Sequence, residues 1–294
     1  MTRFALVASP TAGAGRATKA AELARSVLEA QSHEVVDVHA STAEDAVTRA
    51  RAVVNGGTVD ALVVVGGDGM VHVGINAIAE TNVPLGIVAA GTGNDLARSL
   101  GLPVGDPTSS IETLLAGRIR TIDAVQTRAN ASTRWFVGVL AAGFDAAVNE
   151  RANAWTWPRG QWRYTMATLR ELPVFRPIPY VLTIDGVRRE LSAMLVAVGN
   201  APAYGGGMRV LPQAQLDDGV MDVIILHEAS VATLLRVLPL VFSGRHVGHP
   251  KIEIVTAREV TVDAPSVMAY ADGERFAQLP VELCLVPGAV RVFA

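Results

Sequence analysis

The stretch ALVVVGGDG, residues 61–69, places a glycine-rich turn directly after five consecutive apolar residues. A second stretch, PLGIVAAGTGND at residues 84–95, repeats this arrangement. Short apolar runs bounded by turn residues are typical of buried parallel strands, and both turns are followed by a helical pattern. We therefore expect the two turns to lie side by side at one edge of a parallel sheet.

Glycine turns at strand ends suit the phosphates of a nucleotide. Without a Cβ atom, backbone N–H groups can approach a polyphosphate closely, and positive φ is allowed. Asp68, inside the first turn, would face a magnesium-bound phosphate. The chain has no GxxxxGK[ST] sequence and its only lysines are Lys19 and Lys251, which excludes a P-loop NTPase. Backbone N–H groups, magnesium and arginine must then neutralise the phosphate.

The pattern of the chain changes near residue 122. Before it, apolar strands at 4–8, 34–38, 61–65 and 84–88 alternate with helical segments at 17–31, 43–54 and 71–79, and a further helix is expected at 108–117. After it come short alternating runs with the hairpin signals Asp185-Gly186, Asp272-Gly273 and Pro287-Gly288. We expect an α/β nucleotide-binding domain at residues 1–121, with a parallel sheet and flanking helices, and an antiparallel β-sandwich at 122–287. The last strand, within 288–294, could rejoin the first domain.

Composition supports a well-packed protein of two domains. Of the 294 residues, 50% are hydrophobic and 18% are charged, and the net charge of −3 gives no nucleic-acid footprint. Cys284 is the single cysteine, so no intrachain disulfide can form. The most apolar helical stretch, residues 231–242, is interrupted by Arg236 and Pro239 and is too short to span a membrane. We expect a cytoplasmic protein with at most peripheral membrane contact, and a homodimer is left open.

GGDG at 66–69 together with GTGNDLA at 91–97 resembles the diacylglycerol kinase catalytic domain of bacterial lipid kinases, which are related to sphingosine kinases and more distantly to NAD kinases. The likeness extends over essentially the whole chain. SPTAGAG at 9–15 resembles the opening glycine loop of the family, although Ser9 departs from the usual Asn-Pro start. GFDA at 143–146 and GNAPAYGGG at 199–207 resemble second-domain signatures. The resemblance implies an NAD-kinase-like first domain and a nucleotide held between the two domains.

The resemblance also implies roles for individual residues, with ATP and Mg²⁺ as cofactors. Glu274, in the DGE turn at 272–274, would accept the proton of the attacking hydroxyl, and a single carboxylate base with magnesium suffices for phosphoryl transfer. The acids implied around the metal are Asp68, Asp95, Asp123 and Asp272. The nucleotide contacts implied are Ser9, Thr11, Thr42 (or Ser41), Gly66, Gly67, Asp68, Gly69, Met70, Gly91, Thr92 and Asn94. Asp272-Gly273 as a mere hairpin turn is the alternative.

A structural magnesium is implied by PQAQLDDGV at 212–220. Its ligands would be the side chain of Asp218 and the main-chain carbonyls of Gln215 and Val220, which suits a hard, oxygen-preferring ion. The neighbouring Asp217 leaves the register open by one residue.

One segment departs from the family pattern. Where the family usually reads GGDGT followed by Asn-Glu, this chain has Met70, His72 and Val73. A phosphate cradled by backbone survives the loss of a threonine hydroxyl, whereas loss of the glutamate removes one magnesium or water contact. His72 is a candidate to fill part of that role.

An aromatic and basic segment, WTWPRGQWRY at residues 155–164, lies in the second half of the chain. Trp155 to Tyr164 combine amphipathic rings with arginines, a mixture that suits the headgroup region of an anionic membrane. Packing of these rings beneath a helix is the alternative.

The leading hypothesis is an ATP-dependent lipid kinase that transfers the γ-phosphoryl group to the hydroxyl of diacylglycerol or a similar lipid and yields phosphatidic acid. A kinase for a soluble acceptor such as NAD shares the GGDG turn, but GTGNDLA counts against it. A non-catalytic nucleotide- or lipid-binding regulator is suggested by Met70 and Val73, and the intact Asp68, Asp95 and Glu274 count against that.

Overall fold

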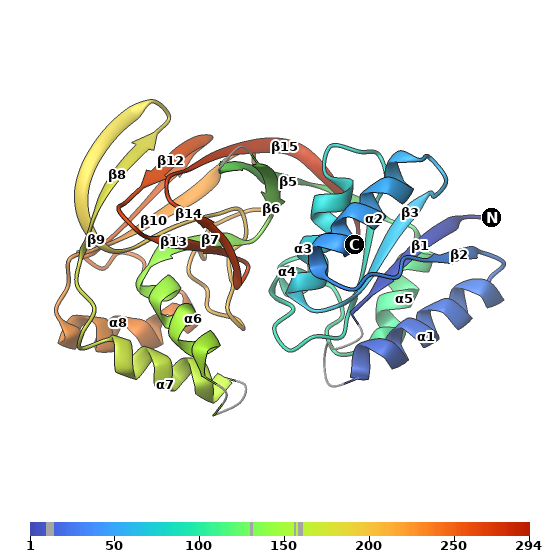
Figure 1. Ribbon diagram of the computed structural model, residues 1–294, viewed down its shortest axis with the longest axis horizontal. Helices are drawn as coiled ribbons and strands as arrows, with labels where there is room; N and C mark the ends of the chain where they lie inside the picture. The colour runs from blue at the N-terminus through green and yellow to red at the C-terminus, as the bar shows by residue number, and fades with distance from the viewer. Residues whose placement is uncertain (10–14, 130–131, 156, 158–160) are drawn as a thin grey trace.

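The computed structural model describes residues 1–9, 15–129, 132–155, 157 and 161–294. Two lobes lie side by side, and the first is a parallel sheet with strand order β4-β3-β1-β2 flanked by helices (Figure 1). Its elements are β1 (Arg3–Ala8), α1 (Arg16–Ala30), β2 (Glu34–Asp37), α2 (Ala43–Asn55), β3 (Ala61–Gly66), α3 (Asp68–Ile78), β4 (Leu85–Ala89), α4 (Asp95–Ser99) and α5 (Pro107–Ala116).

The central strand β3 shows that this sheet is buried on both faces. All six of its residues are buried, as expected of a parallel strand between two helical layers. Leu62 and Val64 pack in one core cluster with residues of α2 and α3, whereas Val63 and Val65 pack in another with residues of α1 and α5. The helices therefore cover opposite faces, and the α/β architecture expected from the sequence is confirmed.

Helix α3 begins three residues earlier than the sequence pattern predicts. The N–H groups of Met70 and Val71 donate to the carbonyl of Gly67 at 2.9 and 3.1 Å, so the glycine turn is itself the first turn of the helix. Asp68 is consequently the first helical residue, where a carboxylate interacts favourably with the helix dipole.

The second lobe is an antiparallel β structure whose described helices lie at one end (Figure 1). One core cluster between its strands includes Phe136, Tyr180, Val223 and Phe276. The elements are β5 (Ile119–Ala129), β6 (Ser132–Phe136), β7 (Val139–Gly143), α6 (Phe144–Ala154), α7 (Gln161–Glu171), β8 (Ile178–Ile184), β9 (Val187–Gly199), β10 (Met221–His227), α8 (Val231–Ser243), β11 (Ile252–Ala257), β12 (Glu259–Asp263), β13 (Met268–Ala271), β14 (Glu274–Gln278) and β15 (Val281–Phe293).

The last strand, β15, connects the two lobes. It pairs antiparallel with β5 along most of its length and with β12 in the second lobe, and then meets β4 of the first lobe in parallel at Val292↔Leu85. The prediction of a hairpin at Pro287-Gly288 is wrong. The strand continues past this dipeptide, the register with β5 shifts between Val286 and Val290, and Gly288 has φ 65°. Proline and glycine mark a β-bulge here, because both flanking segments pair with the same partner strand.

The other two hairpin signals are confirmed. Asp185-Gly186 joins β8 to β9, and Asp272-Gly273 joins β13 to β14. Both residues of each pair have positive φ, between 45° and 83°, which is the conformation of a type I′ turn. The second of these hairpins brings Asp272 and Glu274 to the side of the lobe that faces the first lobe.

Candidate active site

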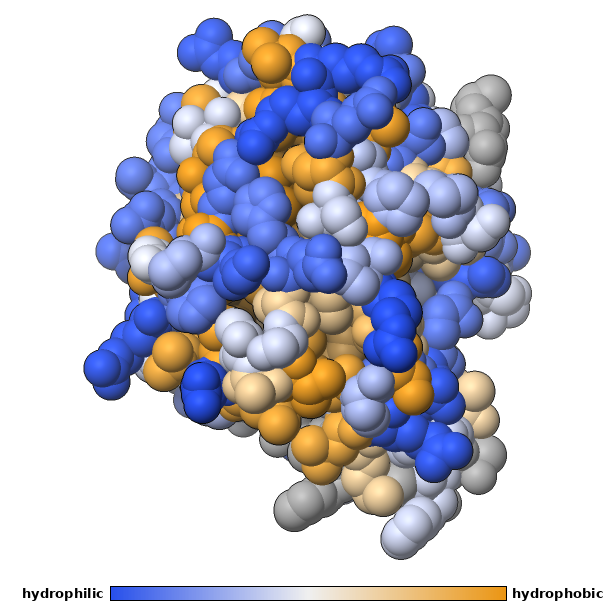
Figure 2. All heavy atoms as spheres, turned by 90° about the vertical axis from the view of Figure 1, so that its left-hand side faces the viewer, coloured by the Kyte–Doolittle hydropathy of each residue, from blue (hydrophilic) through white to orange (hydrophobic). Residues whose placement is uncertain are grey.

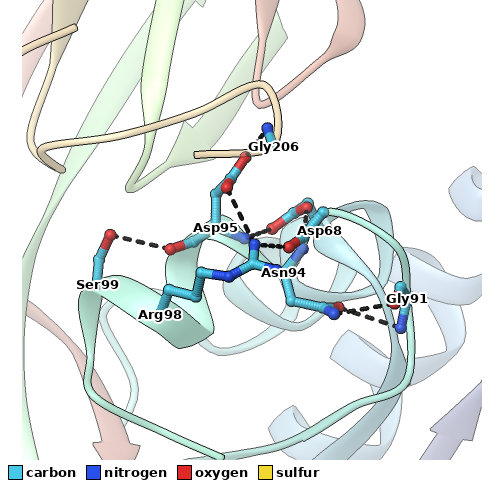
Figure 3. Close-up of polar contacts among 8 residues, drawn as sticks. Asp68, Gly91, Asn94, Asp95, Arg98, Ser99 and Gly206 are labelled. Atoms are coloured by element: carbon cyan, nitrogen blue, oxygen red, sulfur yellow. Dashed lines mark hydrogen bonds and ion pairs between the residues drawn. The ribbon is translucent and has the colours of Figure 1, made fainter. Parts of the chain in front are cut away.

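Asp68 joins the two glycine-rich turns of the first lobe (Figure 3). Its Oδ2 accepts the N–H of Asn94 and its Oδ1 accepts the N–H of Asp95, both at 2.7 Å. A Cβ atom at Gly67 would lie 3.2 Å from the Cα of Gly91, so the two turns approach more closely than most residues allow. The expected side-by-side placement of the turns is thus present in the structure.

Asn94 shapes the second turn. It adopts the left-handed conformation with φ 57°, its Oδ1 accepts the N–H of Gly91 at 3.1 Å, and its Nδ2 donates to the carbonyl of Gly91 at 3.0 Å. Thr92, at the tip of the turn, is exposed. The amide of Asn94 therefore holds the turn, and the tip is left open to solvent.

Asp95 reaches across to the second lobe. Its Oδ2 accepts the N–H of Gly206, in the GGG segment at 205–207, at 2.7 Å (Figure 3). Arg98, one turn further along α4, lies with its Nη1 3.4 Å from Asp95 Oδ1 and also contacts the carbonyl of Gly93. Asp95 is 7% exposed, so these contacts leave little of the carboxylate open to bulk water.

A small cavity between the lobes contains acids from both. It is lined by Asp68, Val71, Asp95, Leu96, Gly138, Ala203, Tyr204, Gly205 and Asp272. Asp272 Oδ1 accepts the N–H of Val139 at 3.0 Å. Burial, together with the nearby charges of Asp68 and Asp95, raises the pKa of Asp272 to about 7 against the lowering effect of backbone N–H groups. Burial and Asp95 likewise raise the pKa of Asp68. This clustering of repelling carboxylates is the electrostatic setting that a divalent cation relieves.

Glu274 stands against the first turn from the opposite lobe. A Cβ atom at Gly69 would lie 3.3 Å from its Oε1, so the carboxylate is in contact range of the GGDG backbone. The residue is exposed, and its neighbour Arg275 pairs with Glu150 at 3.2 Å instead. Glu274 thus has its oxygens at the turn where a terminal phosphate is expected.

His72 occupies the interface between α3 and the second lobe rather than the acid cluster. Its Nε2 lies 3.2 Å from Asn76 Nδ2 and 3.4 Å from Arg134 Nη2, and its ring packs edge-on against Phe276. Burial, with the Arg134 charge, lowers the pKa of His72 to about 4. A neutral imidazole that accepts at Nε2 fits a packing role between the lobes better than contact with a metal. Val73 is 1% exposed in the first-lobe core.

Arg134, which the sequence analysis did not single out, lies between these groups. Its Nη1 donates to the carbonyl of Phe276 at 2.9 Å and its guanidinium carbon lies 4.2 Å above the centre of the Phe276 ring. Burial lowers the pKa of Arg134, and the charges of Glu44 and Glu274 partly offset this effect. Its position in a strand among alternating residues carries no sequence signal, whereas Arg98 could have been found from its i, i+3 spacing after Asp95.

Asp123 is placed away from the cavity and holds two turns. Its Oδ2 accepts the N–H of Gly219 and its Oδ1 accepts the N–H of Gly288, both at 2.8 Å. The residue is 4% exposed. The structure brings Asp68, Asp95 and Asp272 to one cavity but ties Asp123 to the bulge of β15 and to the loop of the expected structural cation.

In the loop expected to hold the structural cation, Asp217 and Asp218 have different partners. Asp217 pairs with Arg120, with Oδ2 to Nη2 at 2.9 Å. Asp218 Oδ1 accepts the N–H of Val220 at 3.2 Å. Burial, with a further contribution from the Asp218 charge, raises the pKa of Asp222 to about 6. Gln215 and Asp218 are exposed. Asp218, which acts on the acidic Asp222, is not paired with Arg120 as Asp217 is, and this favours the register that was expected.

The remaining nucleotide contacts implied by the sequence are more scattered. Ser9 follows β1 and donates its N–H to the carbonyl of Val65 at 3.3 Å, whereas Thr11 lies outside the described residues. Thr42 Oγ1 caps α2 by accepting the N–H of Asp45 at 3.1 Å, and Ser41 also contacts Asp45. Met70 packs partly buried against the core of the first lobe.

Tyr204 and Asp145 form a buried pair on the second-lobe side of the cavity. Burial raises the pKa of Asp145 to about 6, against the lowering effect of hydrogen bonds from Tyr204 and Asn149. Burial and the Asp145 charge raise the pKa of Tyr204 well above its usual value. This pair fixes the loop that presents Gly206 to Asp95. The segments GFDA and GNAPAYGGG pointed to this region without assigning either residue a role.

Two lobes that bring acids and a glycine-turn pair to one cavity define a phosphotransferase of the two-domain kinase class. The family of the diacylglycerol kinase catalytic domain matches residues 3–127, and the family of the YegS C-terminal NAD kinase beta sandwich-like domain matches residues 138–294. The chain belongs to the diacylglycerol kinase family. It is a kinase that transfers phosphate to an alcohol acceptor, and such kinases use ATP and generally a divalent metal.

Individual relatives support this membership. A diacylglycerol kinase of Mycobacterium tuberculosis is 39% identical over 97% of this chain and 92% of its own length. A diacylglycerol kinase of Bacillus subtilis is 27% identical over 96% and 93%. A crystal structure from Bacillus anthracis shares the fold with a TM-score of 0.81 at 21% identity, covering 99% of this chain and 95% of that one.

Proposed function

We propose that this protein phosphorylates the free hydroxyl of diacylglycerol with ATP and releases phosphatidic acid and ADP. The observation that carries the proposal is the approach of Glu274, from the second lobe, to Gly69 of the first glycine turn. A base supplied by one lobe at the phosphate turn of the other is what a hydroxyl acceptor requires. The names of the relatives from M. tuberculosis and B. subtilis support diacylglycerol as the acceptor class.

The proposed step needs one proton transfer and one phosphoryl transfer. The Glu274 carboxylate accepts the hydroxyl proton as the acceptor oxygen forms a bond to the γ-phosphorus. The bond between that phosphorus and the β,γ-bridging oxygen breaks, and its electron pair leaves with ADP. The N–H of Gly91 already donates to Asn94 Oδ1, so the proposed donors for the phosphate oxygens are other backbone N–H groups of the two glycine turns. The two lysines, Lys19 and Lys251, belong to α1 and to the segment before β11.

Asp68, Asp95 and Asp272 are the residues that would hold the catalytic Mg²⁺. Within the described residues, no three His, Cys, Asp or Glu side chains form a ready-made metal site. Magnesium usually keeps several waters and binds one or two carboxylates together with substrate phosphates, so three acids around one cavity fit an ion that arrives with the nucleotide. When bound, the ion would neutralise the charge that develops on the transferred phosphoryl group.

A second Mg²⁺ is proposed at Asp218 with the main-chain carbonyls of Gln215 and Val220. This loop is joined to Asp123 through Gly219, and Asp123 in turn holds the β15 bulge. An ion here would stabilise the loop and the interlobe strand together, without contact with the substrate.

The test is the transfer of labelled γ-phosphate from ATP, with Mg²⁺, to diacylglycerol in mixed micelles and separately to NAD. Wild type should label phosphatidic acid, and Glu274→Gln should not. Label on NAD would assign a soluble acceptor. ATP binding without transfer to any acceptor would assign the non-catalytic regulator.

A further inference from the structure

Five of the eleven large apolar side chains that are exposed in the described part of the chain belong to two helices of the second lobe, and a sixth lies just after one of them. Leu172, which follows α7, and Leu234 of α8 belong to one core cluster, and both helices lie at the same end of the lobe (Figure 1). Figure 2 shows apolar side chains gathered in the lower part of this side, the level at which Figure 1 places α7 and α8. The exposed residues are Met166, Leu169 and Val174 at α7, and Val231, Leu235 and Phe242 on α8. We call them the α7–α8 face.

Helix α8 is apolar on both of its sides. Leu234 and Val237 are buried against the lobe, whereas Val231, Leu235 and Phe242 are 39%, 48% and 55% exposed. Their spacing of four and seven residues places them in one stripe of the helix. A helix that is apolar all round is normally covered, and no described part of this chain covers the outer stripe.

The charges on this face are mainly positive. Residues 229–252 contain no acidic residue but include Arg236, Arg245 and Lys251, and in residues 161–184 the single acidic residue is Glu171. Two acids flank the first stretch, Glu228, which is exposed, and Glu253, which pairs with Arg189. Glu171 is 8% exposed and pairs with Arg151. The face therefore combines exposed apolar side chains with exposed arginines, including Arg170 and Arg236.

We propose that the α7–α8 face docks the protein onto the surface of an anionic lipid bilayer. Apolar side chains that enter the headgroup boundary, flanked by cations that attract lipid phosphate, are the physical features of interfacial helices. No described helix is long and apolar enough to cross a membrane. A second copy of this chain suits the face less well, because a two-fold interface would set the same arginines against one another.

Helix α6 connects the α7–α8 face to the cavity side of the second lobe. Helix α6 starts at Phe144, next to Asp145 at the cavity side, and its other end packs against α7 through Val148, Ala152 and Ala167. Docking would thus hold the second lobe on the bilayer from which a diacylglycerol is taken. In this respect the proposal rests on the lipid-kinase function proposed above and adds its membrane surface. Trp157, 76% exposed, lies near α7, whereas residues 156 and 158–160 of the expected aromatic segment are outside the described part.

The experiment is flotation of the full chain with vesicles of phosphatidylcholine mixed with phosphatidylglycerol. Wild type should float, and the double variant Leu235→Ser/Phe242→Ser should lose about tenfold or more in partitioning because two apolar side chains no longer enter the bilayer. Arg236→Glu should lose binding in a salt-dependent way. Val187→Ser is the matched control, since Val187 is 62% exposed on the β8–β9 hairpin away from these helices, and it should float like wild type.

The outcomes that overturn the proposal are distinct. The proposal is wrong if wild type does not float with the vesicles. It is also wrong if the double variant floats like wild type while its melting curve shows that it is folded, or if Val187→Ser loses as much binding as the double variant. If light scattering shows that wild type is a dimer and that the double variant is a monomer, the face would be assigned to self-association. Phosphorylation of a short-chain diacylglycerol as dispersed monomer separates the two proposals: activity without flotation removes the docking surface alone, and flotation without activity removes the kinase function alone.

Discussion

The N–H of Gly206 in the second lobe donates to Asp95 Oδ2 in the first lobe at 2.7 Å, and the N–H of Asp95 in turn donates to Asp68 Oδ1 at the same distance. A continuous line of hydrogen bonds thus runs from the loop of one lobe to the glycine turn of the other. The residues expected to hold the catalytic metal are also the residues that join the two lobes. Substitutions here will change stability as well as rate.

Asp68→Ala should lower both activity and stability. The variant loses two hydrogen bonds from backbone N–H groups to a charged acceptor, which together stabilise by about 2 to 4 kcal/mol, and the displaced turn should reduce kcat/KM on the order of 10²-fold or more. Urea unfolding and phosphate transfer measure the two effects. Asp60→Ala is the control, because Asp60 Oδ2 also accepts a backbone N–H, that of Arg3 at 2.7 Å, outside the cavity. Undiminished turnover in Asp68→Ala would contradict the assignment.

Glu274→Gln should reduce kcat on the order of 10² to 10⁴-fold and leave ATP binding intact, because the amide keeps the shape of the side chain but cannot accept the proton. Steady-state kinetics and ATP titration separate rate from binding. Glu282→Gln, at an exposed position of β15, should behave as wild type. A parallel loss of ATP binding and rate in Glu274→Gln would instead assign the residue to positioning.

His72 should make the stability of the fold depend on pH. The pKa of His72 lies near 4 in the folded protein against 6.5 for a free imidazole, so the unfolded chain takes up this proton first as the pH falls. The stabilisation is fully present above pH 6.5 and is lost between about pH 6.5 and pH 4, to an extent on the order of 3 kcal/mol.

The measurement is urea unfolding of wild type and His72→Gln across this pH range. Wild type should lose stability relative to the variant as the pH falls. The raised pKa of Asp272 acts in the opposite direction, since the folded state then holds a proton that the unfolded state releases, but it is common to both proteins and cancels in the difference. A difference that does not change with pH would show that His72 is not held neutral by its surroundings.

Removal of Mg²⁺ should lower the melting temperature through the loop at Asp218. Stabilisation by a bound ion grows with its concentration and reaches about 2.7 kcal/mol at a hundredfold excess over Kd. Asp218→Asn should abolish the response of melting temperature to Mg²⁺, and Asp217→Asn should retain it because Asp217 pairs with Arg120. Loss of the response in Asp217→Asn alone would shift the ligand by one residue.

The sequence was most informative where local chemistry and fold agree. The apolar run before Gly66 and the two glycine turns predicted parallel strands and their adjacency, and the structure has both. The Pro287-Gly288 dipeptide misled because a bulge and a hairpin use the same residues, and the distinction depends on whether the next segment pairs with a new strand or with β5.

Part of the candidate site depends on contacts that no local pattern encodes. Asp123 carries an acid in an apolar strand, as a metal ligand would, yet both its oxygens accept backbone N–H groups from residues 96 and 165 positions away in the chain. Arg134 reaches His72 and Phe276 only because β6 and β14 meet α3 in space. Such residues are visible only when the topology of the sheet is known.

The placement of β15 has a consequence for synthesis. Residue Val292 adjoins Leu85 at the edge of the nucleotide lobe, but it leaves the ribosome only after the entire second lobe has been made. The N-terminal lobe must therefore wait during translation with the edge of β4 unpaired, although domains commonly fold as they emerge. Because an open strand edge invites pairing with other chains, the interval between the translation of residues 89 and 292 is the period in which nascent chains of this protein are most exposed to misassembly.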